Sequence, residues 1–182
     1  MKEISLKLCR PKVSDQKSFL AGFDELVEAS DRSSWIYMGD GYPLDPHKDN
    51  FEFYVAALLN RAHSPPQGFV KDTMYWAKVG DEVVGRIAIR HELNEFLSKI
   101  GGHIGYIVRP SWRGKGVATE MLRQLLMTKE AQLIKKLLLT CDEANVASEK
   151  TILKNGGRFE SIIENGVGRP KKKRFWIDLS EQ

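Results

Sequence analysis

The chain has 182 residues, 42% of them hydrophobic and 29% charged, which suits one domain with a buried core and is too short for two ordinary domains. Its net charge of +4 is concentrated at positions 169–174, where five of six residues are Lys or Arg, so the remaining chain sums to about −1. Basic residues of a nucleic-acid-binding surface usually spread over a whole face, so this pattern disfavours nucleic acid as a partner. We expect a single domain over residues 1–182.

The N-terminal residues MKEISLKL are charged from the start, and no run approaches the ~18 apolar residues of a membrane span. We therefore expect a cytoplasmic protein with no membrane partner. The two cysteines, Cys9 and Cys141, lie in apolar runs with no other Cys or His at metal-ligand spacing. We expect reduced, buried thiols and no metal site.

Hydrophobic periodicity predicts five elements in the N-terminal half. In chain order they are a half-buried strand ending at Arg10-Pro11, a helix capped by Ser14, a helix capped by Asp49 or Asn50 and ended by Pro65-Pro66, and hairpin strands at 74–79 and 82–89.

Residues 30–47 have no periodicity and contain two glycines and two prolines, which indicates a long loop. The loop also carries three aromatic residues, Trp35, Tyr37 and Tyr42. Two interpretations remain open: these rings line a binding site, or they cover the edge of a core.

The C-terminal half is predicted to contain six further elements. They are a strand at 103–108, an amphipathic helix beginning near Val117, a buried strand at 134–141, a helix at 145–155 closed by Gly156-Gly157, and strands at 158–163 and 174–179. The complete order is β-α-α-β-β-β-α-β-α-β-β.

The stretch GGHIGYIVRPSWRGKGVA at 101–118 combines a strand, a glycine turn and a helix start. The backbone N–H groups that open a helix have no partner within it and carry partial positive charge. Gly114 and Gly116 permit close approach of a phosphate, and Arg113 and Lys115 add two cations. The stretch therefore predicts a pyrophosphate site.

The spacing excludes the two familiar nucleotide motifs. The dinucleotide fingerprint would need a glycine at Thr119, and the P-loop pattern has no match in the chain. The pattern R-x-x-G-x-A at Arg113, Gly116 and Ala118 instead resembles the acetyl-CoA motif of the GCN5-related N-acetyltransferase (GNAT) superfamily. Residues 89–118 also resemble a bacterial subgroup of largely uncharacterised predicted acetyltransferases.

The resemblance implies an α/β fold with a mixed, largely antiparallel central sheet that splays apart where acetyl-CoA enters. It also implies that residues 102–110 are the fourth strand of the family. The implied acetyl-CoA contacts are the strand backbone at Ile107 and Val108, the loop and helix start, and an asparagine before the next helix. In this sequence those last positions are Arg113, Gly114, Lys115, Gly116, Val117, Ala118 and Asn145.

Two residues that many family members use in catalysis are missing. The tyrosine that protonates the leaving thiolate is replaced by Ile152, and a glutamate early in the fourth strand is replaced by Gly102. His103 is therefore our first candidate for the base, followed by the substrate-side residues His91 and Glu92.

Tyr106 is a second candidate catalytic residue, in the middle of the same strand. Both Tyr106 and His103 also have a structural interpretation, as a core aromatic and as a hydrogen-bonded residue inside the sheet. We predict transfer of an acetyl group from acetyl-CoA to a primary amine, by direct attack in a ternary complex.

The acceptor remains open between a polyamine, an aminoglycoside-like sugar, an amino acid and a protein N-terminus. A non-catalytic CoA-binding module is the alternative, motivated by Ile152, and nucleic acid binding through 169–174 is a third hypothesis. The other interpretation of these cations is the charged tip and edge of a terminal hairpin, where lysines discourage pairing with another strand. Whether the chain forms a homodimer is also open.

Overall fold

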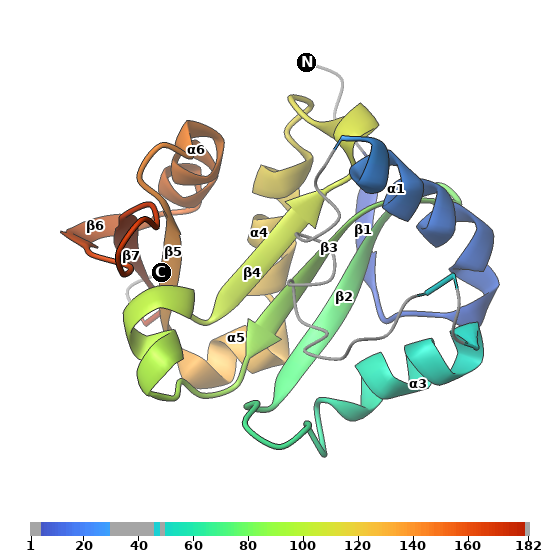
Figure 1. Ribbon diagram of the computed structural model, residues 1–182, viewed down its shortest axis with the longest axis horizontal. Coiled ribbons are helices and arrows are strands. Elements are labelled where there is room, and N and C mark those ends of the chain that lie inside the picture. The colour runs from blue at the N-terminus through green and yellow to red at the C-terminus, as the bar shows by residue number, and fades with distance from the viewer. Residues whose placement is uncertain (1–4, 30–45, 48–49, 181–182) are drawn as a thin grey trace.

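The computed structural model describes residues 5–29, 46–47 and 50–180. Within them, seven strands form two sheets, with the orders β1-β2-β3-β4 and β5-β7-β6, and every paired neighbour is antiparallel (Figure 1). The strands are β1 (Leu6–Cys9), β2 (Asp72–Val79), β3 (Glu82–Arg90), β4 (Ile104–Val108), β5 (Lys136–Asp142), β6 (Arg158–Ile163) and β7 (Lys172–Asp178).

Helices lie on both sides of the first sheet. The α-helices are α1 (Gln16–Glu28), α3 (Phe51–Asn60), α4 (Val117–Leu126), α5 (Lys129–Ile134) and α6 (Val146–Lys154). Short helical turns occupy Val13–Asp15, Leu97–Gly101 and Pro110–Trp112. None of the helices within the described residues is long and apolar enough to cross a bilayer.

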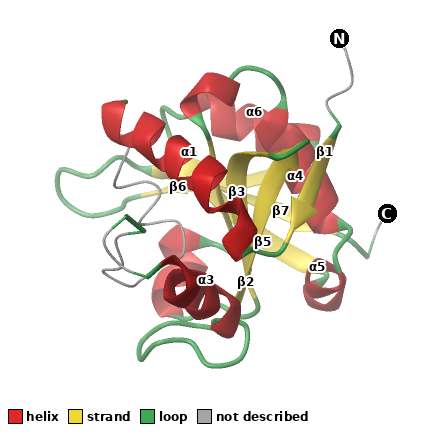
Figure 2. Ribbon diagram, turned by 90° about the vertical axis from the view of Figure 1, so that its right-hand side faces the viewer, coloured by secondary structure: helices red, strands yellow, loops and turns green. Residues whose placement is uncertain are grey.

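The first sheet separates two apolar cores. On one face, α1 and α3 bury aromatic side chains against Trp76, and the Phe19 ring stacks on the Trp76 indole with centroids 4.6 Å apart. Helix α4 lies on the other face (Figure 2), and its apolar residues share a buried cluster with Ile87 and Ile89 of β3. β3 is therefore buried on both faces, which explains its nearly continuous apolar sequence.

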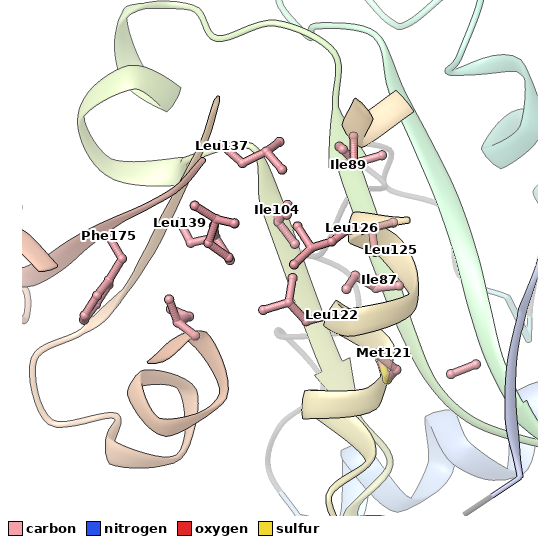
Figure 3. Close-up of a cluster of buried hydrophobic side chains, with 14 of the residues drawn as sticks. Ile87, Ile89, Ile104, Met121, Leu122, Leu125, Leu126, Leu137, Leu139 and Phe175 are labelled. Carbon is pink, nitrogen blue, oxygen red and sulfur yellow. The ribbon is translucent and has the colours of Figure 1, made fainter. Parts of the chain in front are cut away.

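Helix α4 also holds the second sheet. Its Leu122 and Leu126 point toward Ile104 of β4 and the side of β5, whereas Leu125 lies beside Ile87 of β3 (Figure 3). One helix therefore covers the junction of the two sheets. Burying these leucines contributes about 1.5–3 kcal/mol each by the usual transfer estimate.

The structure confirms the predicted order of elements and adds detail to it. Asn50 caps α3 by accepting hydrogen bonds from two backbone N–H groups. Gly156, with φ of +83°, closes α6 as predicted. Asp49, Trp35, Tyr37 and Tyr42 lie outside the described residues.

Four local predictions need correction. Ser14 does not cap a helix: it lies inside the turn at 13–15, and Asp15 precedes α1. The short helix α5 and the turn at 97–101 were not predicted. Finally, β7 is the central strand of its sheet, not an edge strand. Of the thiols, Cys141 is buried and Cys9 is half-buried.

Candidate active site

Strands β4 and β5 touch at one point and then diverge (Figure 1). At the contact, the His103 N–H donates to the Leu138 carbonyl at 2.7 Å, and the Leu138 N–H donates to His103 Nδ1 at 2.9 Å. Beyond it, β4 has no ladder partner other than β3 in the described part of the chain. One backbone edge of β4 is therefore open.

The register shows which backbone groups line this edge. Arg109 N–H donates to the Val84 carbonyl at 2.9 Å and Arg90 N–H to the His103 carbonyl at 2.8 Å, so bonded pairs alternate along β3 and β4. Ile107 falls in a bonded position, and its N–H and C=O face β3. Those of Tyr106 and Val108 face the open side.

Beyond β4, the chain makes the predicted glycine turn into α4. Gly114 and Gly116 have φ of +73° and +83°, which side chains with a Cβ rarely adopt. A Cβ added at either glycine would have no heavy atom within 4 Å, so conformation, not crowding, requires glycine here. Gly116 is the N-cap of α4 and no side chain caps this helix start among the described residues. Its first N–H groups are thus available to an anion.

Two cations flank this helix start. Lys115 places its Nζ over the Trp112 ring, 4.9 Å from the centroid, and Arg113 Nε donates to the Val108 carbonyl at 3.3 Å. Both side chains are exposed. Val117 is buried and Ala118 half-buried at the first turn of α4. The backbone N–H groups, the helix dipole and both cations therefore all favour a negatively charged ligand.

Asn145 stands at the start of α6, where its Oδ1 accepts a hydrogen bond from Ser148 N–H at 3.0 Å. The side chain is exposed. The N-cap role is compatible with contact to a ligand, because capping uses only the amide oxygen.

Tyr106 reaches from β4 to α6. Its hydroxyl lies 2.7 Å from Ser148 Oγ and 3.4 Å from the Ser148 carbonyl. Burial raises the pKa of Tyr106 to about 12, although the hydrogen bond with Ser148 lowers it. The phenol is therefore protonated at neutral pH. Ser148 was not among the predicted site residues, although its position three residues after the helix-capping Asn145 pointed to it.

The surroundings of His103 suit a structural role better than a catalytic one. Burial and the nearby Arg90 cation lower the pKa of His103 to about 4, so the ring is neutral at pH 7. Its Nδ1 lone pair accepts the Leu138 N–H, which leaves the ring proton on Nε2. A ring in this state has no lone pair free to take a proton from an amine.

His91 and Glu92 follow the end of β3, next to the start of β4 and away from the α4 helix start. His91 Nε2 lies 2.8 Å from Thr73 Oγ1, and Glu92 is exposed. Tyr106, Val108 and the start of α4 thus lie along the open edge of β4. His91 and Glu92 lie near the opposite end of that strand.

The basic residues near the C-terminus are paired with carboxylates. Each of four consecutive cations contacts a different acid: Lys171 with Glu164 at 2.8 Å, Lys172 with Asp142 at 2.6 Å, Lys173 with Glu149 at 2.8 Å, and Arg174 with Glu160. Three of these acids come from β5, α6 and β6, so the cations attach β7 to its neighbours. This pairing argues against the nucleic acid hypothesis.

No group of three or more His, Cys, Asp or Glu side chains suited to a metal ion occurs within the described ranges. The predicted chemistry at this site does not require one.

Solved structures share the fold of this chain over nearly its whole length. A ribosomal L7/L12 alpha-N-protein acetyltransferase in complex with coenzyme A has a TM-score of 0.65 at 15% identity, covering 99% of this chain and 98% of its own. A microcin C7 self-immunity acetyltransferase in complex with acetyl-CoA and AMP has a TM-score of 0.64 at 14% identity, with coverages of 95% and 92%.

A chimera of the spermidine N-acetyltransferase SpeG from Vibrio cholerae and hSSAT has a TM-score of 0.59 at 17% identity, covering 97% of this chain and 96% of its own. A comparison with curated protein sequences finds no match. The model of the acetyltransferase (GNAT) domain family matches residues 11–158. The chain therefore belongs to the GNAT acetyltransferase family.

Proposed function

We propose that this protein transfers an acetyl group from acetyl-CoA to a primary amine by direct attack in a ternary complex. The observation that carries the proposal is the uncapped start of α4, with Gly114 and Gly116 in left-handed conformations, at the end of the open edge of β4. A diphosphate fits this helix start, and an extended amide-bearing arm fits the strand edge.

The binding roles follow from this geometry. The N–H groups of residues 114–118, with Arg113 and Lys115, hold the diphosphate. We assign the contacts with the pantetheine amides to the backbones of Tyr106 and Val108. The register supports this assignment, because the backbone of Ile107 faces β3. Asn145 adds a contact from the start of α6.

In the reaction, the amine nitrogen attacks the acetyl carbon, the carbon–sulfur bond breaks, and the proton lost by the amine ends on the CoA sulfur. A backbone N–H on the open edge of β4 polarises the thioester carbonyl. We assign to Tyr106 the role of assisting the CoA sulfur as it leaves. With a pKa of about 12, its phenol does not release a proton outright to a thiolate of ordinary pKa near 8.5. It donates a hydrogen bond and relays a proton, with Ser148 as its partner.

On the amine side, the occupied Nδ1 lone pair argues against His103 as the base. His91 and Glu92 remain our candidates there, directly or through water. A polyamine and a protein N-terminus are both reasonable acceptors, because solved relatives of similar fold act on each according to their descriptions.

The proposal is tested by measuring CoA release with a panel of spermidine, an aminoglycoside, free amino acids and N-terminal peptides. We expect turnover with at least one acceptor, and a Tyr106→Phe variant with kcat reduced about 10²-fold and an unchanged KM for acetyl-CoA. Tyr75→Phe is the matched control, because burial raises the pKa of Tyr75 to about 12 as well, on a different strand. Equal losses in both variants would exclude the relay role.

The alternative is a module that binds CoA without catalysis. Ile152, which occupies the position of the usual tyrosine, is completely buried in the core beside α4 and cannot contribute to chemistry. Tight CoA binding in calorimetry without turnover above background across the panel would favour this alternative.

A further inference from the structure

We infer that Glu25 of α1 and Glu82 of β3 are positioning residues for the loop before α4 to which we assigned the diphosphate. They act through Arg109 and Trp112. The inference rests on the proposed function of that loop and concerns residues that no family motif identified in the sequence. Its basis is a continuous set of polar contacts from α1 to Lys115.

Glu25 uses both carboxylate oxygens on the segment that enters the loop. Arg109 Nε donates to Glu25 Oε1 at 2.7 Å, and Ser111 N–H donates to Oε2 at 3.1 Å. Burial alone would raise the pKa of Glu25, but the hydrogen bonds from Arg109 and Ser111 outweigh burial and lower it. The carboxylate is therefore charged and fixed between a side chain and a backbone group of the same turn.

A second carboxylate extends the contacts to the loop cation. Arg109 also pairs with Glu82 Oε1 at 2.9 Å, and the same oxygen accepts Trp112 Nε1–H at 2.9 Å. The Trp112 ring in turn lies under the Lys115 ammonium. Glu82 thus orients the ring that holds Lys115 beside the helix start.

Arg109 itself packs closely against α1. A Cβ added to Gly22 would lie 3.3 Å from Arg109 Cδ, so the arginine stem runs along the helix backbone at this glycine. Its side chain is only 12% exposed, and its guanidinium already contacts two carboxylates. Arg109 is therefore occupied within the protein, and the diphosphate is left to Arg113, Lys115 and the backbone.

This arrangement predicts a ligand-specific effect. Removing one charge of the network should loosen the turn at 110–112 and the position of Lys115, which matters only for ligands that carry the diphosphate. The pantetheine contacts along β4 should be unaffected, because they depend on the β3–β4 ladder.

The test compares Glu25→Gln and Glu82→Gln with wild type by calorimetry, using CoA, dephospho-CoA and pantetheine as probes. We expect 5- to 10-fold weaker binding of CoA and dephospho-CoA, both of which contain the diphosphate, and less than a 2-fold change for pantetheine (estimated from a lost charged hydrogen bond). Glu28→Gln, an exposed carboxylate on the same helix, is the matched control and should bind all three probes as wild type does.

A double-mutant cycle of Glu25→Gln with Lys115→Met, measured with CoA alone, gives an independent readout. If Glu25 acts through the loop, its effect should be at least halved when Lys115 is already neutral. Full additivity, parallel losses for pantetheine, or unchanged CoA affinity in both Glu variants would overturn the inference. Failure of wild type to bind CoA would instead overturn the proposed function.

Discussion

His103 shows that a histidine expected to be catalytic from its position can instead have a structural role in the folded protein. Burial and Arg90 lower its pKa from 6.5 to about 4. The unfolded chain therefore binds a proton near pH 6.5 that the folded protein does not bind until about pH 4. The stability associated with the neutral ring is fully present above pH 6.5 and is lost as the pH falls toward 4, by on the order of 2 kcal/mol.

We predict that a His103→Asn variant removes much of this pH dependence. The Asn Oδ1 can replace Nδ1 as acceptor of the Leu138 N–H without titrating. Urea unfolding at pH 7.5 and pH 4.5 should show a smaller stability loss in the variant than in wild type. A variant that loses as much stability as wild type over this interval would show that other groups cause the dependence.

Single residues also show where sequence reasoning stops. The glycine turn at Gly114 and Gly116 could be predicted because it depends on local spacing alone. Glu25 could not, because its partner Arg109 lies 84 positions away and nothing local to α1 indicates the contact. The neutral state of His103 likewise depends on Leu138, which only the folded chain brings near.

Helix α4 is the element on which the proposed CoA site depends, and the role of its start can be tested separately from its contribution to stability. Gly116→Ala forces a residue with a Cβ into φ of +83°, at a cost of about 1–2 kcal/mol. Relief of that strain would reorient the first N–H groups of α4. We predict about 10-fold weaker CoA binding in calorimetry, equivalent to about 1.4 kcal/mol.

Gly168→Ala is the matched control, since Gly168 also has a positive φ of +72° and open space around its missing Cβ, but lies in the loop between β6 and β7. It should lose similar stability and keep its CoA affinity. Loss of CoA affinity in both variants would mean that strain anywhere in the protein weakens the site.

The elements themselves were predictable where hydrophobic periodicity was long. The apolar face of α4 and the apolar runs of the two hairpin strands define their elements locally. The six-residue helix α5 is too short for a period, although Thr128 does cap it by accepting the Ala131 N–H. Ser14 failed as a cap because the chain first makes a tight turn at 13–15.

For the molecule as a whole, the order of elements could be predicted from periodicity, but the division into two sheets was expected only from the family resemblance. Each strand shows its own periodicity, whereas the partner of a strand edge depends on contacts distant in sequence. The two lysines and the arginine that begin β7 illustrate this, because the sequence suggested an exposed edge and the fold pairs these cations with acids from three neighbouring elements. The contact of β4 with β5 is similarly invisible in the sequence.

We predict that the contact between β4 and β5 is important for the stability of the protein. Gly102 has φ of +65°, and a Cβ on it would lie 2.6 Å from the Leu138 carbonyl oxygen. Gly102→Ala should therefore separate the strands where they meet and destabilise the protein by about 2–4 kcal/mol in urea unfolding. In Gly101→Ala the new Cβ meets only the end of the Leu97 side chain, which can rotate, so the loss should be much smaller. Equal losses would show that the two sheets do not depend on this junction.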